Sequence, residues 1–407
     1  MTFITQWYIL TELGPSIETD AYIAGGTVPQ ILLAIISGSL MQVLVPMLAG
    51  ETKEKAEQTS STLLLASGIL FMTIAALIFI SAPYVIPIAV PGFSENAKLL
   101  TLEITKINLL GMILGGINCV YWSTLNARKS FRKIEIIQIS TSGVAYGLLT
   151  QTLPEYGIQA AVWIGVMRAA LQTTIYFTIS NNSTTIVFNK EIAIATWGKI
   201  SPLLAGASYY KIDPLVDRAL LSNAESGGIS LYFLTQQIYG AYSQIINNSV
   251  IGPSIPRLSQ LHKMKKRSFF RRIYYRQIAV VSVISFSIFI VTVTAGYIYL
   301  RCQPEYANAM LDSVSRVWWL LLCLGGMFLG GTLGQLTTGC FYAIGDTRSP
   351  TKLGVLTYTV YLPGKILAFQ WYGTTGLALS ASLFLITNLT LQHFFIVKKL
   401  GSREQFN

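Results

Sequence analysis

Charged residues are scarce in this sequence of 407 residues. Only 12% of the residues are Asp, Glu, Lys or Arg and 52% are hydrophobic, whereas a soluble domain usually carries about 25% charged residues. The hydrophobic content also excludes a disordered chain. The mean hydropathy of +0.53 and the long apolar runs between short polar clusters are typical of a membrane protein that crosses the bilayer several times.

Cysteine and histidine are rare and scattered. The four cysteines form no Cys-x-x-Cys pair, and His262 and His393 lie far apart in the sequence. Cysteines of this kind are usually small core residues, so we expect no metal site and no cofactor. The sequence also lacks a G-x-x-x-x-G-K-[ST] phosphate loop, a G-x-S-x-G motif and an H-E-x-x-H motif. We therefore expect no enzyme, and a transporter driven by a gradient fits better than an ATPase.

Apolar runs of about 20 residues, the length that a spanning helix needs, predict twelve helices. They lie near residues 1–14, 21–49, 60–91, 99–126, 134–153, 158–180, 198–221, 227–256, 273–300, 315–343, 353–371 and 374–397. At about 1.5 Å per residue the first run is too short for a hydrocarbon core of roughly 30 Å. We therefore expect that this helix is half-length or begins upstream of Met1.

The loops between these helices differ sharply in charge. Twenty-one Lys and Arg residues lie in the loops that follow the even-numbered helices and in the tail, whereas the opposite loops hold only Lys98 and Arg301. Basic loops stay in the cytoplasm, so we expect both termini on the cytoplasmic side. The densest basic stretch, residues 257–276, could bind an anionic lipid headgroup or a nucleic acid. We interpret it as a topology anchor and expect no nucleic-acid partner.

The two sets of six predicted helices resemble each other weakly. The matches are Tyr22, Ser39, Pro46 and Leu48 with Tyr232, Ser249, Pro256 and Leu258; Ala127 and Arg132 with Ala343 and Arg348; and Gly157-Ile158 with Gly376-Leu377. Because six is an even number, both sets have the same orientation, which is a parallel repeat. We therefore expect two pseudo-symmetric six-helix lobes around a central cavity, residues 1–182 and 183–407, joined by the loop at 181–197.

Several charged residues fall inside the predicted spans. The basic ones are Lys106, Arg168, Lys211, Arg218, Arg316 and Lys365, and Asp213 and Asp217 accompany them on the seventh helix. A charge at mid-bilayer costs about 2.5–3.5 kcal/mol on insertion scales, so it usually faces a cavity or a partner.

Two interpretations of the seventh helix stay open. In the first, Lys211 and Arg218, which are nearly two turns apart, form a cationic cavity wall for an anionic headgroup. Asp213 and Asp217 then couple transport to an ion. In the second, these charges pair with one another and only allow a polar helix to insert. Lys365 is a further candidate for the cavity wall.

Short motifs along the chain resemble the MurJ/MviN family, flippases of lipid-linked cell-wall precursors within the MOP superfamily. The matching stretches are Thr19-Asp20-Ala21-Tyr22, Pro91-Gly92-Phe93, Leu125-Asn126-Ala127, Val216-Asp217-Arg218 with Gly227-Gly228-Ile229-Ser230, Pro256-Arg257-Leu258-Ser259, the loop from Phe341 to Pro350, and Gly376-Leu377-Ala378-Leu379-Ser380. The resemblance runs from Asp20 to about Leu400. It implies an alternating-access cavity, and a polyprenyl-diphosphate-linked saccharide as cargo. At the matching positions Asp20, Asp217 and Arg218 are candidate cargo contacts.

The sequence departs from that family where the family carries cavity arginines. Thr5 stands in the first helix at such a position, Leu33 and Ala34 stand where a basic pair is usual, and Gln237 replaces a further arginine. A neutral side chain cannot supply the bidentate charged contact that arginine makes with a phosphate. Gln237 stays a candidate cavity residue. The family's thirteenth and fourteenth helices have no counterpart in this sequence.

Three functional hypotheses follow. The first is a flippase that moves the peptidoglycan precursor lipid II or a related surface-polysaccharide unit across the bacterial cytoplasmic membrane. The second is an antiporter of small organic cations from the same superfamily, which would favour a cavity rich in carboxylates. The third is a non-transporting scaffold that binds proteins of cell-wall or polysaccharide synthesis. Membrane lipids are expected partners, and nothing in the sequence requires more than a monomer.

Overall fold

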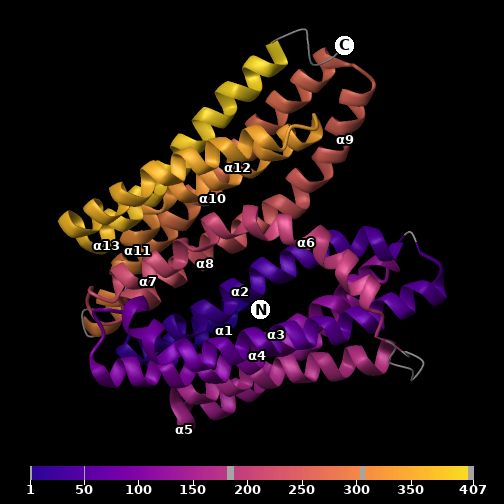
Figure 1. Ribbon diagram of the computed structural model, residues 1–407. Coiled ribbons are helices and arrows are strands. Elements are labelled where there is room, and N and C mark those ends of the chain that lie inside the picture. Colours follow the sequence, from indigo (N-terminus) through magenta and orange to yellow (C-terminus); the bar gives the residue numbers. More distant parts are fainter. Residues whose placement is uncertain (1, 50, 181–187, 303–307, 402–407) are drawn as a thin grey trace. The chain divides into compact units, whose positions relative to one another are not determined.

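The computed structural model describes residues 2–49, 51–180, 188–302 and 308–401, and nearly all of these residues are helical (Figure 1). No strand occurs among them. The helices are α1 (Thr2–Leu13), α2 (Ile17–Ala49), α3 (Lys53–Ala89), α4 (Glu95–Ala127), α5 (Phe131–Ser180), α6 (Lys190–Lys211), α7 (Asp213–Leu221), α8 (Gly228–Ile246), the π-helix η1 (Asn247–Ile251), α9 (Gly252–Lys263), α10 (Arg267–Cys302), α11 (Asn308–Cys323), α12 (Gly325–Ala343) and α13 (Arg348–Gly401).

Each of the twelve predicted segments coincides with helix in the described part of the chain. Helices α5 and α13 each contain two predicted segments, separated by a non-helical glycine at Gly157 (φ 57°) and Gly373 (φ 56°). Helices α6 and α7 form the predicted seventh segment, α8, η1 and α9 the eighth, and α11 with α12 the tenth. The expected all-α class is therefore confirmed.

Fewer helices pass a strict test for membrane spans. Among the described residues, five helices are long and apolar enough to cross a membrane, and α11 with α12, bent by 45° at their break, would make a sixth. The five are α2, the part of α3 from Lys55, α4, α10 and α13. Crossing of the bilayer by the remaining predicted segments stays a prediction.

Backbone turns support the internal repeat. Six of the seven residues with positive φ in the described chain form pairs that are 213 or 216 positions apart, and Lys265 is the exception. The pairs are 14 and 227, 129 and 345, and 157 and 373. The sequence comparison was wrong in one detail, because it paired Gly157 with Gly376. Gly376 lies within the helix after the turn, and Gly373 makes the turn itself.

The chain forms two compact units, Met1–Ser230 (unit 1) and Leu231–Asn407 (unit 2). Unit 1 extends beyond the predicted first lobe because α6 packs against α2, and α7 packs against α3. The predicted lobe boundary at 182/183 falls within residues 181–187, outside the described residues, so the division into lobes stays a prediction.

Unit 1 is built around α4, which packs against α2, α3 and α5. Small residues permit these close contacts, as is usual between membrane helices. A Cβ atom at Gly116 would lie 2.1 Å from the ring of Phe71 on α3. The apolar core around this contact includes Leu44, Leu109 and Val120.

Unit 2 has its most extensive contact between α12 and α13, and α10 packs against α12. Gly326 and Gly330 of α12 lie against α13, where added Cβ atoms would approach Ser382 and Leu385 to 2.8 and 2.7 Å. On α8 the Tyr239 ring stacks on Phe328 at 4.8 Å, and its hydroxyl donates a hydrogen bond to the Leu321 carbonyl oxygen at 2.6 Å.

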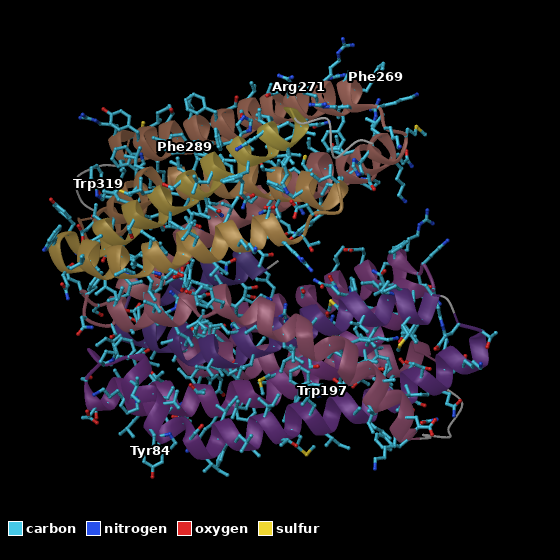
Figure 2. The ribbon with its side chains drawn as sticks, turned by 45° about the horizontal axis from the view of Figure 1, so that its top comes forward. Tyr84, Trp197, Phe269, Arg271, Phe289 and Trp319 are labelled. Carbon is cyan, nitrogen blue, oxygen red and sulfur yellow. The ribbon has the colours of Figure 1, made fainter. Side chains whose placement is uncertain are left out.

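Large apolar side chains cover the outer surfaces of both units. Tyr84 in unit 1 is 77% exposed and Trp319 in unit 2 is 51% exposed, and Figure 2 shows both at the outside. Exposed apolar area of this extent marks a surface that another apolar phase covers. Together with the apolar helices, it is the surface of a membrane protein.

Candidate functional site

Asp20, at the start of α2, holds the turn that precedes α8. Its carboxylate is 2% exposed and accepts hydrogen bonds from the Gly227 and Ser230 backbone amides, each at 2.8 Å. It also accepts a short hydrogen bond from the Ser230 hydroxyl. A carboxylate at the amides of a helix start satisfies donors that have no partner within the helix. Asp20 therefore caps α8 from a helix more than 200 positions away in the sequence.

The motif Pro91-Gly92-Phe93 contacts the end of α7, shortly before the turn that Asp20 holds. The Gly92 amide donates to the Ser222 hydroxyl at 3.0 Å, and a Cβ atom at Gly92 would lie 2.4 Å from the Ser222 carbonyl oxygen. We call the set Thr19, Asp20, Gly92, Ser222, Gly227 and Ser230 the motif cluster. The cluster thus comprises two contacts within unit 1, one between Asp20 and the turn before α8 and one between Gly92 and the end of α7.

The charged residues of the seventh predicted segment divide between two helices. Lys211 ends α6, and its Nζ donates to the Ala34 carbonyl oxygen on α2 at 2.9 Å. Asp213 begins α7 and is partly exposed, whereas Asp217 and Arg218 are each 3% exposed. Lys211 therefore contacts α2, and the two central charges of α7 are buried.

The two remaining predicted site residues lie in unit 2. Gln237 is partly buried on α8. Lys365 of α13 is fully buried, with its Nζ 5.2 Å from the centre of the Tyr361 ring. A groove of about 690 Å³ runs along the two segments of α13 and is lined mainly by apolar residues, Tyr361 and Phe384 among them. Lys365 is not among its lining residues.

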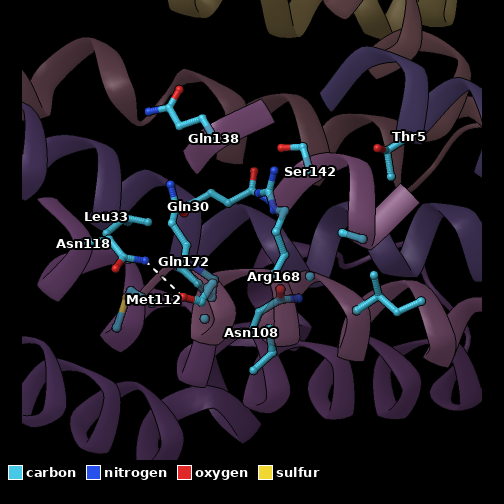
Figure 3. A pocket seen from close by; sticks show the side chains of 18 of the residues that line it. Thr5, Gln30, Leu33, Asn108, Met112, Asn118, Gln138, Ser142, Arg168 and Gln172 are labelled. Carbon is cyan, nitrogen blue, oxygen red and sulfur yellow. Dashed lines mark hydrogen bonds between the residues drawn. The ribbon is translucent and has the colours of Figure 1, made fainter. Parts of the chain in front are cut away.

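Unit 1 contains a polar cavity of about 450 Å³ between α1, α2, α4 and α5 (Figure 3). Six amide side chains line it: Gln6, Gln30, Asn108, Asn118, Gln138 and Gln172. Arg168 of α5 is the one basic residue among the described lining residues, and none of them is acidic. Figure 3 shows Arg168 and Gln30 reaching into the same part of the cavity.

None of the predicted site residues lines this cavity. Of the basic residues that the sequence places within helices, only Arg168 does so. Thr5 and Leu33, which stand where the resembling family carries arginines, are both lining residues. The sequence did contain a signal, because amide side chains recur within otherwise apolar runs. Their convergence depends on the packing of four helices and could not be read from spacing.

The loop from Phe341 to Pro350 lies in unit 2, where it contacts both ends of α13. Asp346 accepts hydrogen bonds from the Arg348 and Ser349 backbone amides at 3.1 and 2.9 Å, which caps the start of α13. Lys399, near the end of the same helix, pairs with the Asp346 carboxylate and donates to the Ser349 hydroxyl. Burial alone would raise the pKa of Asp346, but the hydrogen bonds from Lys399 and Ser349 outweigh burial and lower the pKa to about 2.

The described residues hold no group of three or more His, Cys, Asp or Glu side chains that could bind a metal ion. The chemistry available in the unit 1 cavity is hydrogen bonding by amides and hydroxyls, with a single guanidinium for an anion among the described lining residues.

Solved structures of transporters share this fold. A lipid II flippase MurJ in an inward closed conformation matches with a TM-score of 0.79 and 16% identity, over 98% of this chain and 88% of that chain. An inward-facing multidrug resistance MATE family transporter of the MOP superfamily matches with a TM-score of 0.74 and 12% identity, over 98% of both chains. A MOP superfamily transporter from Pyrococcus furiosus matches with a TM-score of 0.67 and 13% identity, over 98% of this chain and 91% of that chain.

Identities this low establish the fold alone. The sequence itself gives the closer assignment, because the family model described as lipid II flippase MurJ matches residues 9–406. The resemblance that the motifs indicated is thereby confirmed, and the chain belongs to the MurJ family of membrane transporters.

Proposed function

We propose that this protein is a flippase that moves a polyprenyl-diphosphate-linked saccharide across the bacterial cytoplasmic membrane by alternating access. The observation that carries the proposal is the family match over residues 9–406. The polar cavity inside the apolar helices of unit 1 supports it, because a hydrophilic headgroup needs such a compartment to cross a bilayer. Lipid II and a related surface-polysaccharide unit are the two candidate cargos.

In this proposal the motif cluster closes one side of the transport path. Basic loops stay in the cytoplasm, and their positions predict both termini on the cytoplasmic side. The turn before α2 and the turn after α7 then lie on the outer side of the membrane. The Asp20 carboxylate is fully occupied by hydrogen bonds to residues 227 and 230. This supports a closing role for Asp20 instead of the cargo contact expected from the sequence. Alternating access then requires these bonds to break and re-form in each cycle.

The other predicted residues keep their proposed roles. Lys211, Asp217, Arg218, Gln237 and Lys365 are proposed cargo contacts outside the unit 1 cavity, which none of them lines. Asp213 and Asp217 are proposed to couple transport to an ion. Burial of Asp217, Arg218 and Lys365 supports such roles, since a buried charge within a membrane helix is usually functional.

Reconstitution into proteoliposomes tests the function. A fluorescent polyprenyl-diphosphate-linked disaccharide is placed in both leaflets, and a membrane-impermeant quencher reports the fraction that reaches the outside. The proposal predicts that wild-type protein makes nearly all of the fluorophore accessible, whereas empty vesicles leave about half protected. Rescue of a bacterium depleted of its own lipid II flippase would identify lipid II as an accepted cargo.

The same vesicles separate the other hypotheses. Exchange of an organic cation for protons without lipid movement would favour the antiporter. Absence of both activities in a correctly inserted protein would favour the scaffold. The cavity of unit 1 has no carboxylate among its described lining residues, which speaks against a site for organic cations.

A further inference from the structure

The unit 1 cavity carries little charge. Arg168 is the one cation among its described lining residues, and no acid balances it there. Thr5 and Leu33 line the wall where the family resemblance leads one to expect further arginines. A guanidinium binds one phosphate group in a bidentate manner. The cavity therefore offers one strong anion contact and no more.

The remaining wall is suited to hydroxyl groups. The Asn118 side chain is 8% exposed, and its Nδ2 donates to the Ala169 carbonyl oxygen at 3.2 Å. Five further amide side chains line the same cavity. Each amide can donate a hydrogen bond to a ligand hydroxyl through its nitrogen and accept one through its oxygen.

We infer that the unit 1 cavity is the headgroup site for a neutral saccharide joined to its carrier lipid through phosphate, with Arg168 holding the sugar-proximal phosphate. This inference rests on the proposed flippase function and narrows its cargo. A saccharide that bears a peptide with several carboxylates, as lipid II does, would place unpaired negative charges in a cavity with one cation. The cavity therefore favours a surface-polysaccharide unit over the peptidoglycan precursor.

Calorimetric binding to the purified full chain tests this selectivity. The two probes are farnesyl-diphosphate-linked N-acetylglucosamine, which has a neutral sugar, and the farnesyl-diphosphate-linked disaccharide pentapeptide. We expect the neutral probe to bind at least tenfold more tightly. Arg168→Gln should weaken the neutral probe about 10- to 100-fold, the range for losing a charged hydrogen bond, and Arg168→Lys should restore part of the loss. Arg132→Gln, at an exposed residue in the first turn of α5, is the control and should change neither affinity.

Weaker binding by Arg168→Gln could also result from misfolding, so a variant that should gain affinity is needed as well. Leu33→Arg adds a second cation to the same wall and should improve binding of the peptide-bearing probe more than that of the neutral probe. Equal affinities for both probes, or tighter binding of the peptide-bearing probe by the wild type, would overturn the inference while leaving a flippase in place. Binding of neither probe, together with absence of lipid movement in vesicles, would overturn the proposed function as well.

Discussion

The motif cluster and the unit 1 cavity are opposite in character, although both belong to unit 1. In the cluster, residues that resemble the family are held by hydrogen bonds, and Asp20 alone accepts from two backbone amides and a hydroxyl. In the cavity, residues that depart from the family line the wall together with six amide side chains and Arg168. The difference indicates that the motif residues of the cluster hold helices together, whereas Arg168 and the six amides that line the proposed headgroup site lie outside the motifs.

The largest expected effect comes from breaking the cluster at Asp20. Asp20→Ala should destabilise the protein by about 3 kcal/mol or more, because each buried donor left without an acceptor costs about 1–3 kcal/mol. Thermal unfolding in detergent measures the loss, and Glu18→Gln, an exposed neighbour, serves as control. An unchanged unfolding temperature in Asp20→Ala would show that the cluster does not hold α8.

Gly92 tests the same cluster through packing alone. Gly92→Ala places a Cβ atom 2.4 Å from the Ser222 carbonyl oxygen, and we expect a loss of about 1–3 kcal/mol, typical of overpacking. Gly143→Ala on α5 is the matched control because nothing lies within 4 Å of its added Cβ. Equal stability of the two variants would contradict the close approach.

The cavity should behave in the opposite way. Arg168→Gln should slow transport of the saccharide about tenfold or more, as loss of a charged hydrogen bond predicts, while the unfolding temperature stays close to that of the wild type. Parallel measurement of vesicle transport and thermal unfolding checks both statements. If Arg168→Gln were as unstable as Asp20→Ala, the distinction between the two regions would be lost.

The smallest effect concerns Asp346. Like Asp20 in the cluster, its carboxylate caps a helix start by accepting hydrogen bonds from backbone amides. Its pKa is lowered to about 2 in the folded protein from an unperturbed value of about 3.9. The stability that it contributes is therefore present above pH 4 and is lost as the pH falls toward 2. Asp346→Asn should flatten this part of the pH profile of unfolding. Asp312→Asn, at an exposed carboxylate of α11, should leave the profile unchanged.

The sequence predicted the fold better than the site. Twelve helical segments followed from apolar runs, and even the breaks at 157 and 373 fell where two predicted segments met. Hydropathy suffices for this because each segment must satisfy its backbone hydrogen bonds internally in a membrane.

The site could not be derived in the same way. Sequence reasoning favoured charged residues, and the structure places Asp20 in a helix cap and Lys211 against a backbone carbonyl. The cavity is instead lined by amides from four helices, with Gln6 and Gln172 among the most distant in sequence. An isolated amide in an apolar run can bond to its own helix, so only the packed structure shows which amides share a cavity.

Filling the cavity is the most direct test that cargo passes through unit 1. Gly165 of α5 lines the cavity and has open space at its Cβ, whereas Gly147 of the same helix has open space but does not line it. In the vesicle assay, we predict that Gly165→Trp abolishes movement of the lipid-linked saccharide and that Gly147→Trp moves it at the wild-type rate. Equal transport by both variants would contradict the proposed path.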